Sequence, residues 1–321
     1  MNLLYSGYIT DVEGIKVGHY EDLENLTGCS VIICEEGATG GIDVRGSAPG
    51  TRETDLFQDK KTVDKIHSVV LSGGSAFGLD ASGGVMKYLE EKNVGFDTGI
   101  IKVPIVSSAV IFDLGLGNPH IRPDFNMGYL ASKNSNNKDY SQGNVGAGAG
   151  ASVGKILGKK FSMKSGLGSA SVILGDLVVS AMVVVNAVGD VYNLKGKKIA
   201  GVYDYENSKF LDSIEIMKSG YINTLEGVNT TIGVVATNAI LTKGQSNKVA
   251  EMAHNALAKR IMPVHTTFDG DTVFSLSTNK VEADVNLVGT LGIEAMEKAI
   301  VNSILSSKGV DNLFSFEDLN K

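Results

Sequence analysis

The chain has 321 residues, of which 43% are hydrophobic, so it is long enough for one large domain with a sizeable core. Its net charge of −7 argues against nucleic acid or an anionic membrane surface as the main partner. The two cysteines suit neither a disulfide framework nor a metal site, which predicts reduced core thiols in a cytoplasmic protein. The amino terminus lacks the pattern of a signal peptide, and no apolar stretch is long enough to cross a membrane.

The first third of the chain alternates apolar segments with glycine-rich turns. Residues 29–34 are predicted to form a buried strand with a cysteine on each face, and 37–46 to pair with it as a hairpin. Residues 66–71 are predicted to form another strand, followed by the glycine turn 72–78 and a helix over about 79–92. The turn lacks the spacing of phosphate-binding motifs. We expect it to pack the helix on the sheet and to offer amides to a carbonyl or carboxylate.

Two neighbouring segments in the middle of the chain differ sharply in composition. Residues 129–141 are polar, and Lys133 to Lys138 are predicted to form a mobile loop. In residues 142–155, glycines recur at every second position from Gly146 to Gly150, which lets a ligand or another backbone lie against one face. Lys155 ends this uncharged run, and it is either partly buried or a surface lysine with a buried stem.

A second hairpin is predicted from residues 169–174 and 177–185, which flank the turn Gly175-Asp176. Asn186 ends the second of these strands. An asparagine at a strand end either caps the following turn or presents its amide to an oxyanion. Residues 195–221 are polar, and they are expected to be an irregular connection to the next strand.

Residues 227–239 begin with a small turn and continue as a β-branched, apolar strand. Thr230 at its start is either an ordinary strand-edge residue or a nucleophile that is exposed when the chain cuts itself after Asn229. The Asn-Thr step allows the second reading, because the hydroxyl can attack the preceding carbonyl and the freed α-amine can then act as general base. The local sequence alone does not decide between the two.

The remaining elements complete a mixed fold. Apolar residues at helical spacing predict a helix over 246–261, and a last helix is expected over about 283–307. Between them lie Asp269 and Asp271, one residue apart across a glycine turn, which suits a turn cap, a cation site or a hydrogen-bonding pair. Paired strands and two long helices predict an α+β fold with stacked sheets between helix layers.

Several of these stretches together resemble one family, the self-processing aminopeptidases. It contains D-aminopeptidase/esterases, β-peptidyl aminopeptidases and nylon-oligomer (6-aminohexanoate oligomer) endohydrolases. The matching stretches span most of the chain: residues 9–12, 14–18, 43–46, 48–56, 71–80, 110–114, 143–155, 185–190, 229–239 and 269–278.

The resemblance assigns roles to single residues. Thr230 falls on the nucleophile, Asn229 on the residue before the cut, Asn186 on an oxyanion-holding Asn, and Asp269 and Asp271 on an acidic pair near the nucleophile. The remaining matches are Lys155, on an active-site lysine of the nylon-hydrolase branch, Phe112, where that branch has a Tyr, and Gln142, near a Glu that binds the substrate's amine in aminopeptidase members. Gly146 is expected in the glycine-rich wall of the substrate pocket.

The resemblance also implies the architecture and the reaction. The fold is expected to be an αββα sandwich resembling the N-terminal-nucleophile hydrolases, with a single domain over 1–321 cut into 1–229 and 230–321. The predicted activity is hydrolysis of short peptides or linear amides, in a homotetramer of processed pairs. The alternative is acyl transfer of the acetylornithine transferase type from the same threonine. Nothing in the sequence calls for a metal or an organic cofactor.

Overall fold

The computed structural model describes residues 4–220, 229–310 and 313–320. Nine of its strands belong to one hydrogen-bonded sheet in the order β10-β11-β16-β18-β2-β4-β7-β3, and β1 pairs with β2 beside this path. The bounds of these strands are β1 Lys16–Asp22, β2 Thr27–Val44, β3 Thr51–Arg52, β4 Lys65–Ser72, β7 Val106–Val110, β10 Leu167–Leu174, β11 Leu177–Asn186, β16 Thr230–Ala239 and β18 Thr272–Val281.

The long strand β2 belongs to two layers. Its first half pairs with β1 and β4, and its last residues, 39–44, pair with β18. The register of β2 against β4 shifts between Ile33 and Ala38, where Gly37 has a φ of 75°. Residues 37–46 are therefore not a hairpin partner of 29–34, and that prediction is wrong. A glycine-assisted irregularity bends the strand here without reversing it.

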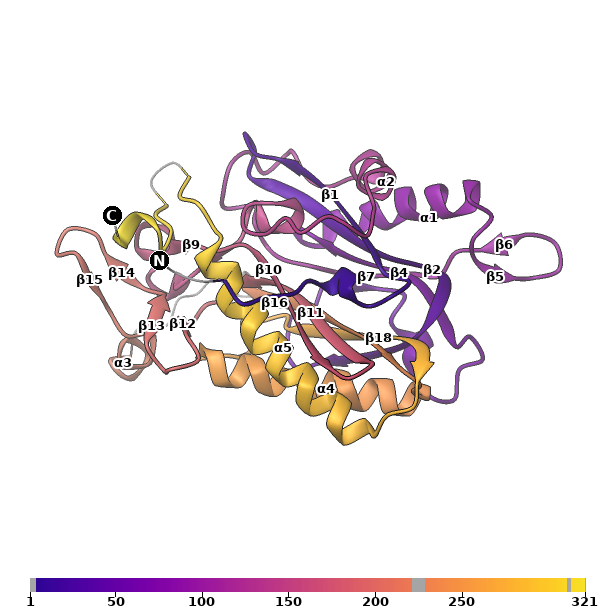
Figure 1. Cartoon of the computed structure of the whole chain (residues 1–321). Helices are drawn as coiled ribbons and strands as arrows, with labels where there is room; N and C mark the ends of the chain where they lie inside the picture. The colour runs from indigo at the N-terminus through magenta and orange to yellow at the C-terminus, as the bar shows by residue number, and fades with distance from the viewer. Residues whose placement is uncertain (1–3, 221–228, 311–312, 321) are drawn as a thin grey trace.

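Helices cover the outer face of each layer (Figure 1). The helices α1 and α2 lie over β1, β2, β4 and β7, while α4 and α5 pack together over the layer that contains β10, β11, β16 and β18. Side chains pack between the layers as well as beneath the helices. The helices are α1 Ala81–Glu91, α2 Phe125–Lys133, α3 Ser213–Lys218, α4 Lys243–Arg260 and α5 Val285–Leu305.

The central strands of the large sheet, such as β11 and β16, are buried on both faces, because alternate residues enter different cores. In β11, Val183 and Val185 pack under the helices, whereas Met182 and Val184 face the other layer. In β2, Cys29 likewise faces the helix side and Cys34 the interlayer core, so the two thiols lie on opposite faces as predicted. These packed layers give the αββα sandwich that the sequence predicts.

Local signals account for the hairpin and the long helices. Gly175, with a φ of 59°, turns the chain between β10 and β11, which confirms that hairpin. The α4 helix begins with a capping box of Thr242 and Gln245, and Asp284 caps α5 by accepting two backbone N–H groups. Within the described residues, no helix combines the length and apolar character that crossing a bilayer requires.

Two segments expected to be irregular are ordered. Helix α2 extends through Lys133, and Asn136 forms a two-way backbone pair with Val17 of β1, so the segment Lys133 to Lys138 is anchored to the sheet. The backbone pairing outweighs its polar composition. The stretch 195–220 contains short strands and α3, while residues 221–228 lie outside the described chain.

The remaining short strands are β5 Phe96–Asp97, β6 Lys102–Val103, β8 Ser152–Val153, β9 Met163–Lys164, β12 Asp190–Tyr192, β13 Lys198–Ala200, β14 Tyr203–Asp204, β15 Lys209–Phe210 and β17 Ile261–Met262.

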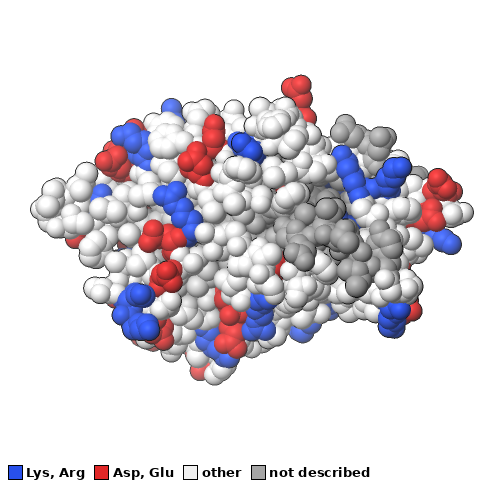
Figure 2. Space-filling view, turned by 180° about the vertical axis from the view of Figure 1, so that it is seen from behind, with Lys and Arg blue, Asp and Glu red and all other residues white. Residues whose placement is uncertain are grey.

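On the face seen in Figure 2, basic and acidic groups lie interspersed among uncharged residues, and they do not gather by sign.

Candidate active site

Thr230 is the first residue of β16, in the middle of the sheet. It pairs with Asn186 at the end of β11, and the preceding residue, Asn229, forms a parallel bridge with Asp269. The side chain is buried, and its hydroxyl donates to the carbonyl oxygen of Asn229. The N–H of Gly270 donates to the same oxygen over 3.0 Å. The carbonyl before Thr230 is therefore polarised by two donors.

Asn186 is buried beside Thr230 and forms hydrogen bonds through both its Oδ1 and its Nδ2. Its Oδ1 accepts the N–H of Ser152 at 3.1 Å and Lys155 Nζ at 2.8 Å. Its Nδ2 donates to the carbonyl of Phe112 at 3.0 Å. Because an amide nitrogen carries two hydrogens, one has no acceptor among the described residues. Asn186 is thus a junction that ties Phe112, Lys155 and the start of β16 together.

Lys155 follows Gly154, which has a φ of 71°. Lys155 is partly buried, which agrees with the first of the two alternatives that the sequence left open. Its Nζ donates to both the backbone carbonyl and the side chain of Asn186, at 2.9 and 2.8 Å. Burial lowers the pKa of Lys155 to about 7, and the negative charges of Asp269, Asp113 and Asp271 limit that shift. A lysine in this condition exchanges a proton near neutral pH.

Asp269 and Asp271 are both buried, and hydrogen bonds hold each carboxylate. Asp269 Oδ2 accepts the N–H and the hydroxyl of Thr266, each at 2.7 Å. Asp271 Oδ1 accepts the N–H of Thr231 at 2.7 Å, and its Oδ2 lies 2.8 Å from Nδ1 of His265. These contacts are to N–H and O–H donors, and no group of three or more His, Cys, Asp or Glu side chains suited to a metal ion is found among the described residues.

Burial and the neighbouring Asp271 carboxylate raise the pKa of Asp269 to about 6, while the charge of Lys155 opposes the shift. Folding therefore favours the protonated carboxyl. The protonated Asp269 carboxyl therefore stabilises the folded state fully at pH values below its ordinary pKa of 3.8. This stabilisation is lost as the pH rises through the folded-state pKa of about 6. Asn in place of Asp269 keeps the shape and an oxygen for Thr266 but carries no charge. We expect Asp269→Asn to melt at a higher temperature than its parent at pH 8, and at a similar temperature near pH 4.

Calorimetric scans between pH 4 and pH 8 measure this difference. Parent and variant are both made in the Thr230→Ala background, so that the two samples have the same covalent chain. A melting-temperature difference that stays constant across this range contradicts the expectation.

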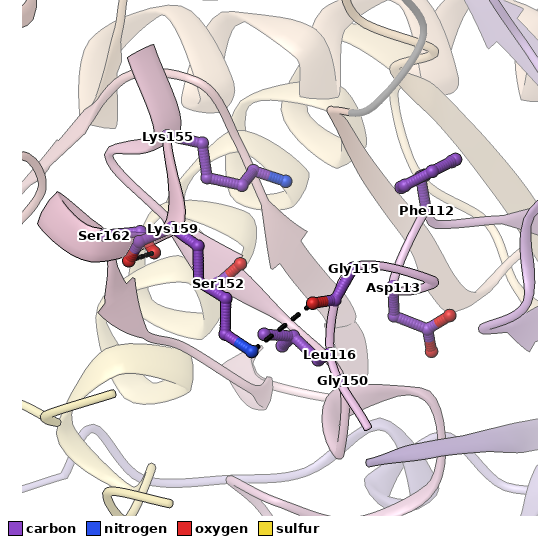
Figure 3. Close-up of a pocket in the computed structure, with 9 residues that line it drawn as sticks. All are labelled: Phe112, Asp113, Gly115, Leu116, Gly150, Ser152, Lys155, Lys159 and Ser162. Carbon is purple, nitrogen blue, oxygen red and sulfur yellow. Dashed lines mark hydrogen bonds between the residues drawn. The ribbon is translucent and has the colours of Figure 1, made fainter. Parts of the chain in front are cut away.

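A pocket of about 120 Å³ opens beside Lys155 (Figure 3). Lys155, Ser152 and Lys159 line one side of it, and Phe112 lies opposite. Its other lining residues are Asp113, Gly115, Leu116, Gly150 and Ser162.

The structure does not bring every predicted residue to this place. Gln142 accepts the backbone N–H of Ser169 in β10, and the N–H of Gly146 donates to Glu21. A Cβ on Gly146 would meet Ser30 and His19, so its small size serves packing against β1 and β2. Of the glycine-rich run, Gly150 lines the pocket, and Gly146 does not.

Three neighbouring residues were missed in the sequence. His265 and Thr266 hold the two carboxylates, and both precede the pair closely in the chain, which is the signal that could have indicated them. Asp113 lies in the pocket wall and accepts the Gly74 N–H at 2.7 Å, so it is the carboxylate that the glycine turn 72–78 was expected to receive. Burial raises its pKa to about 6.

Comparison with solved structures places the fold. An L-aminopeptidase D-Ala-esterase/amidase from Ochrobactrum anthropi, described as a variant of the Ntn hydrolase fold, superposes with a TM-score of 0.76. The alignment covers 100% of this chain and 93% of that chain at 17% sequence identity. At this identity the likeness concerns the fold, and it confirms the predicted resemblance to the N-terminal-nucleophile hydrolases.

Sequence comparison gives the family. An uncharacterized aminopeptidase of Mycobacterium leprae is 37% identical, over 94% of this chain and 91% of that protein. A 6-aminohexanoate-oligomer endohydrolase of Agromyces is 32% identical, over 85% of this chain and 75% of that protein. The profile described as Peptidase family S58 matches residues 7–313. With a match over nearly its whole length, the chain belongs to peptidase family S58.

Proposed function

We propose that this chain is a self-processing amide hydrolase that is cut between Asn229 and Thr230 and uses Thr230 as its amino-terminal nucleophile. One observation carries the proposal: the Thr230 hydroxyl and the Gly270 N–H both donate to the carbonyl oxygen of Asn229. A hydroxyl next to a polarised carbonyl is what transfer of an acyl group from nitrogen to oxygen requires. Membership in a peptidase family makes the chain a hydrolase of peptide or amide bonds.

In the proposed cleavage, Thr230 Oγ1 attacks the carbonyl carbon of Asn229. The peptide C–N bond breaks, and the Thr230 nitrogen takes up the hydroxyl proton. Water then hydrolyses the ester, which releases residues 1–229 as a carboxylate and leaves residues 230–321 with a free α-amine. This amine lies beside its own hydroxyl and serves as general base in each later turnover.

The surrounding residues have distinct tasks in this scheme. The second Nδ2 hydrogen of Asn186 is available to the oxyanion that forms next to Thr230. Asp271 fixes the backbone immediately after the nucleophile by accepting the Thr231 N–H. Lys155 and Asp269 balance charge in the buried site, since each influences the pKa of the other.

Intact-mass measurement of active protein tests the processing step. Cleavage after Asn229 leaves 229 residues and 321 − 229 = 92 residues, of about 24 and 10 kDa by proportion of chain length. The smaller fragment should begin with Thr230. An active preparation that contains only the intact chain contradicts the proposal.

The proposed substrates are short peptides or linear amides, on the strength of the family and of the related 6-aminohexanoate-oligomer endohydrolase. The small pocket beside Lys155 has Phe112 and Leu116 in its wall, which suits a narrow, unbranched acyl chain. Parallel assays on D-alanyl, β-alanyl and 6-aminohexanoyl amides test this range. If the cut protein hydrolyses none of the three amides, the proposed substrate range is wrong.

Acyl transfer to an amine is not favoured, because the relatives described above are named as peptidases and hydrolases. Incubation with acetylornithine and glutamate distinguishes the two reactions, since a transferase forms acetylglutamate.

We further propose a homotetramer of processed pairs in the cytoplasm. The side chains of Ile100 and Ile101 on the β5–β6 hairpin are 94% and 53% exposed, which favours burial against another subunit, and both cysteines are free and buried. Light scattering should give about 135 kDa, four times the 33.8 kDa of one chain. A mass near one chain at all dilutions rules out the assembly.

A further inference from the structure

The two oxygens of the Asp271 carboxylate face different parts of the molecule. Oδ1 accepts the N–H of Thr231, the residue after the proposed nucleophile, at 2.7 Å. Oδ2 receives the His265 backbone N–H at 3.2 Å and lies 2.8 Å from His265 Nδ1. The direction in which Oδ1 points is therefore set from the opposite side of the carboxylate, by one residue.

The surroundings of His265 determine which ring nitrogen carries hydrogen. Nδ1 faces a carboxylate oxygen, which can only accept, so Nδ1 is the donor. Nε2 is buried and has no hydrogen-bond partner among the described residues. The ring therefore has one polar contact within the described part of the chain, and it is with Asp271.

His265 is held in place from behind. The ring of His254, on α4, meets it edge to face with centroids 4.9 Å apart. His254 is itself fixed, because its Nε2 lies 3.0 Å from the carbonyl oxygen of Asp43 in β2. The backbone of His265 is left-handed, with a φ of 56°, a conformation that non-glycine residues rarely adopt. Because the His265 side chain is held in place, its contact with Oδ2 favours one orientation of the Asp271 carboxylate.

We infer that His265 is a positioning residue that orients the Asp271 carboxylate toward the backbone of the nucleophile strand. The family resemblance in the sequence assigned roles to the acidic pair and to none of the histidines. Since Asp271 accepts donors on both oxygens, loss of the Nδ1 donor frees its carboxyl group to rotate and leaves a buried charge with less compensation.

The inference is tested with replacements that the left-handed backbone tolerates. Asn places an N–H donor near the position of Nδ1, Asp has the same shape without the donor, and Gly removes the side chain. We expect His265→Gly and His265→Asp to slow both processing and kcat by about 10- to 100-fold, the effect of losing a hydrogen bond to a charged group, with KM unchanged. His265→Asn should stay within about threefold of the native rates.

A merely structural role predicts a different result, in which all three variants lower the melting temperature and the folded protein keeps its kcat. The inference is overturned if Asn and Asp behave alike, whether both are slow or both are normal. This pair carries the test even where the glycine variant does not fold. His67→Asn is the matched control, because this buried histidine accepts the N–H of Ile105 in another part of the sheet and should leave kcat unchanged.

A double-mutant cycle gives a second readout. Because His265 acts through Asp271, adding His265→Gly to Asp271→Asn should not slow processing further, as followed by the fraction of cut chain over days. Losses that multiply contradict the inference.

The inference rests on the proposed function, and the same cycle separates the two. Normal rates in Asp271→Asn alone remove the role proposed for the acidic pair. A slow Asp271→Asn beside a normal His265→Gly removes only the role of His265.

Discussion

Thr230→Ala should remain an uncut chain of 33.8 kDa without amidase activity. The substitution removes the hydroxyl that donates to the Asn229 carbonyl oxygen, and with it the proposed attacking atom of both processing and turnover. Thr230 is buried at the start of a strand that pairs through its backbone. Alanine is smaller and keeps this backbone pairing, so the chain should still fold. The expected loss of activity is at least about 10³-fold, as for other nucleophiles.

Two control substitutions, one at Thr230 itself and one at the next residue, test whether the loss of cleavage is specific to the Thr230 hydroxyl. Thr230→Ser keeps a hydroxyl at the same position and should still be cut, although at a different rate. Thr231→Val keeps the backbone N–H that Asp271 accepts, and it removes a buried hydroxyl that has no hydrogen-bond partner among the described residues. It should be cut normally. If Thr230→Ala is processed and active, Thr230 is not the nucleophile.

Asp271→Asn should slow processing and turnover by about 10²- to 10³-fold. The carboxylate receives N–H groups on both oxygens, whereas an asparagine has one oxygen and an NH₂. One donor in the site must then face another donor, either at Thr231 or at His265. That mismatch should displace the backbone beside the proposed nucleophile, at a cost of about 1–3 kcal/mol of stability, which leaves the chain folded.

Comparing the rates of Asp271→Asn and Asp269→Asn distinguishes a role of the acidic pair in the active site from a role as simple turn caps. Asp269 also holds the turn at Thr266, but an asparagine oxygen can still accept both of those hydrogen bonds. A turn cap predicts a small loss of stability and near-normal rates in both variants. Asp190→Asn is the control for loss of a buried carboxylate, because Asp190 binds Lys198 and Ser213 and should affect stability without slowing the chemistry.

The sequence by itself determined the elements whose signals are local. Alternation and turn residues located the β10–β11 hairpin, the strand that begins at Thr230 and the faces of Cys29 and Cys34, since strand periodicity and turn geometry depend on a few adjacent residues. The same rules failed at Gly37, where a glycine bends a continuing strand. A bend and a reversal share the same residue preferences, and only pairing partners distinguish them.

The cluster of candidate active-site residues was decided by the tertiary structure. β16 lies between β11 and β18, and its pairing places Asn186 beside Thr230 and Asp269 beside Asn229, although about 40 residues separate each pair in the chain. No local pattern specifies that arrangement, because it depends on which strands pair and in which register. For the same reason His265 acquired its role next to Asp271, while Gln142 and Gly146, close to Lys155 in sequence, were directed to β10 and to the packing of β1 on β2.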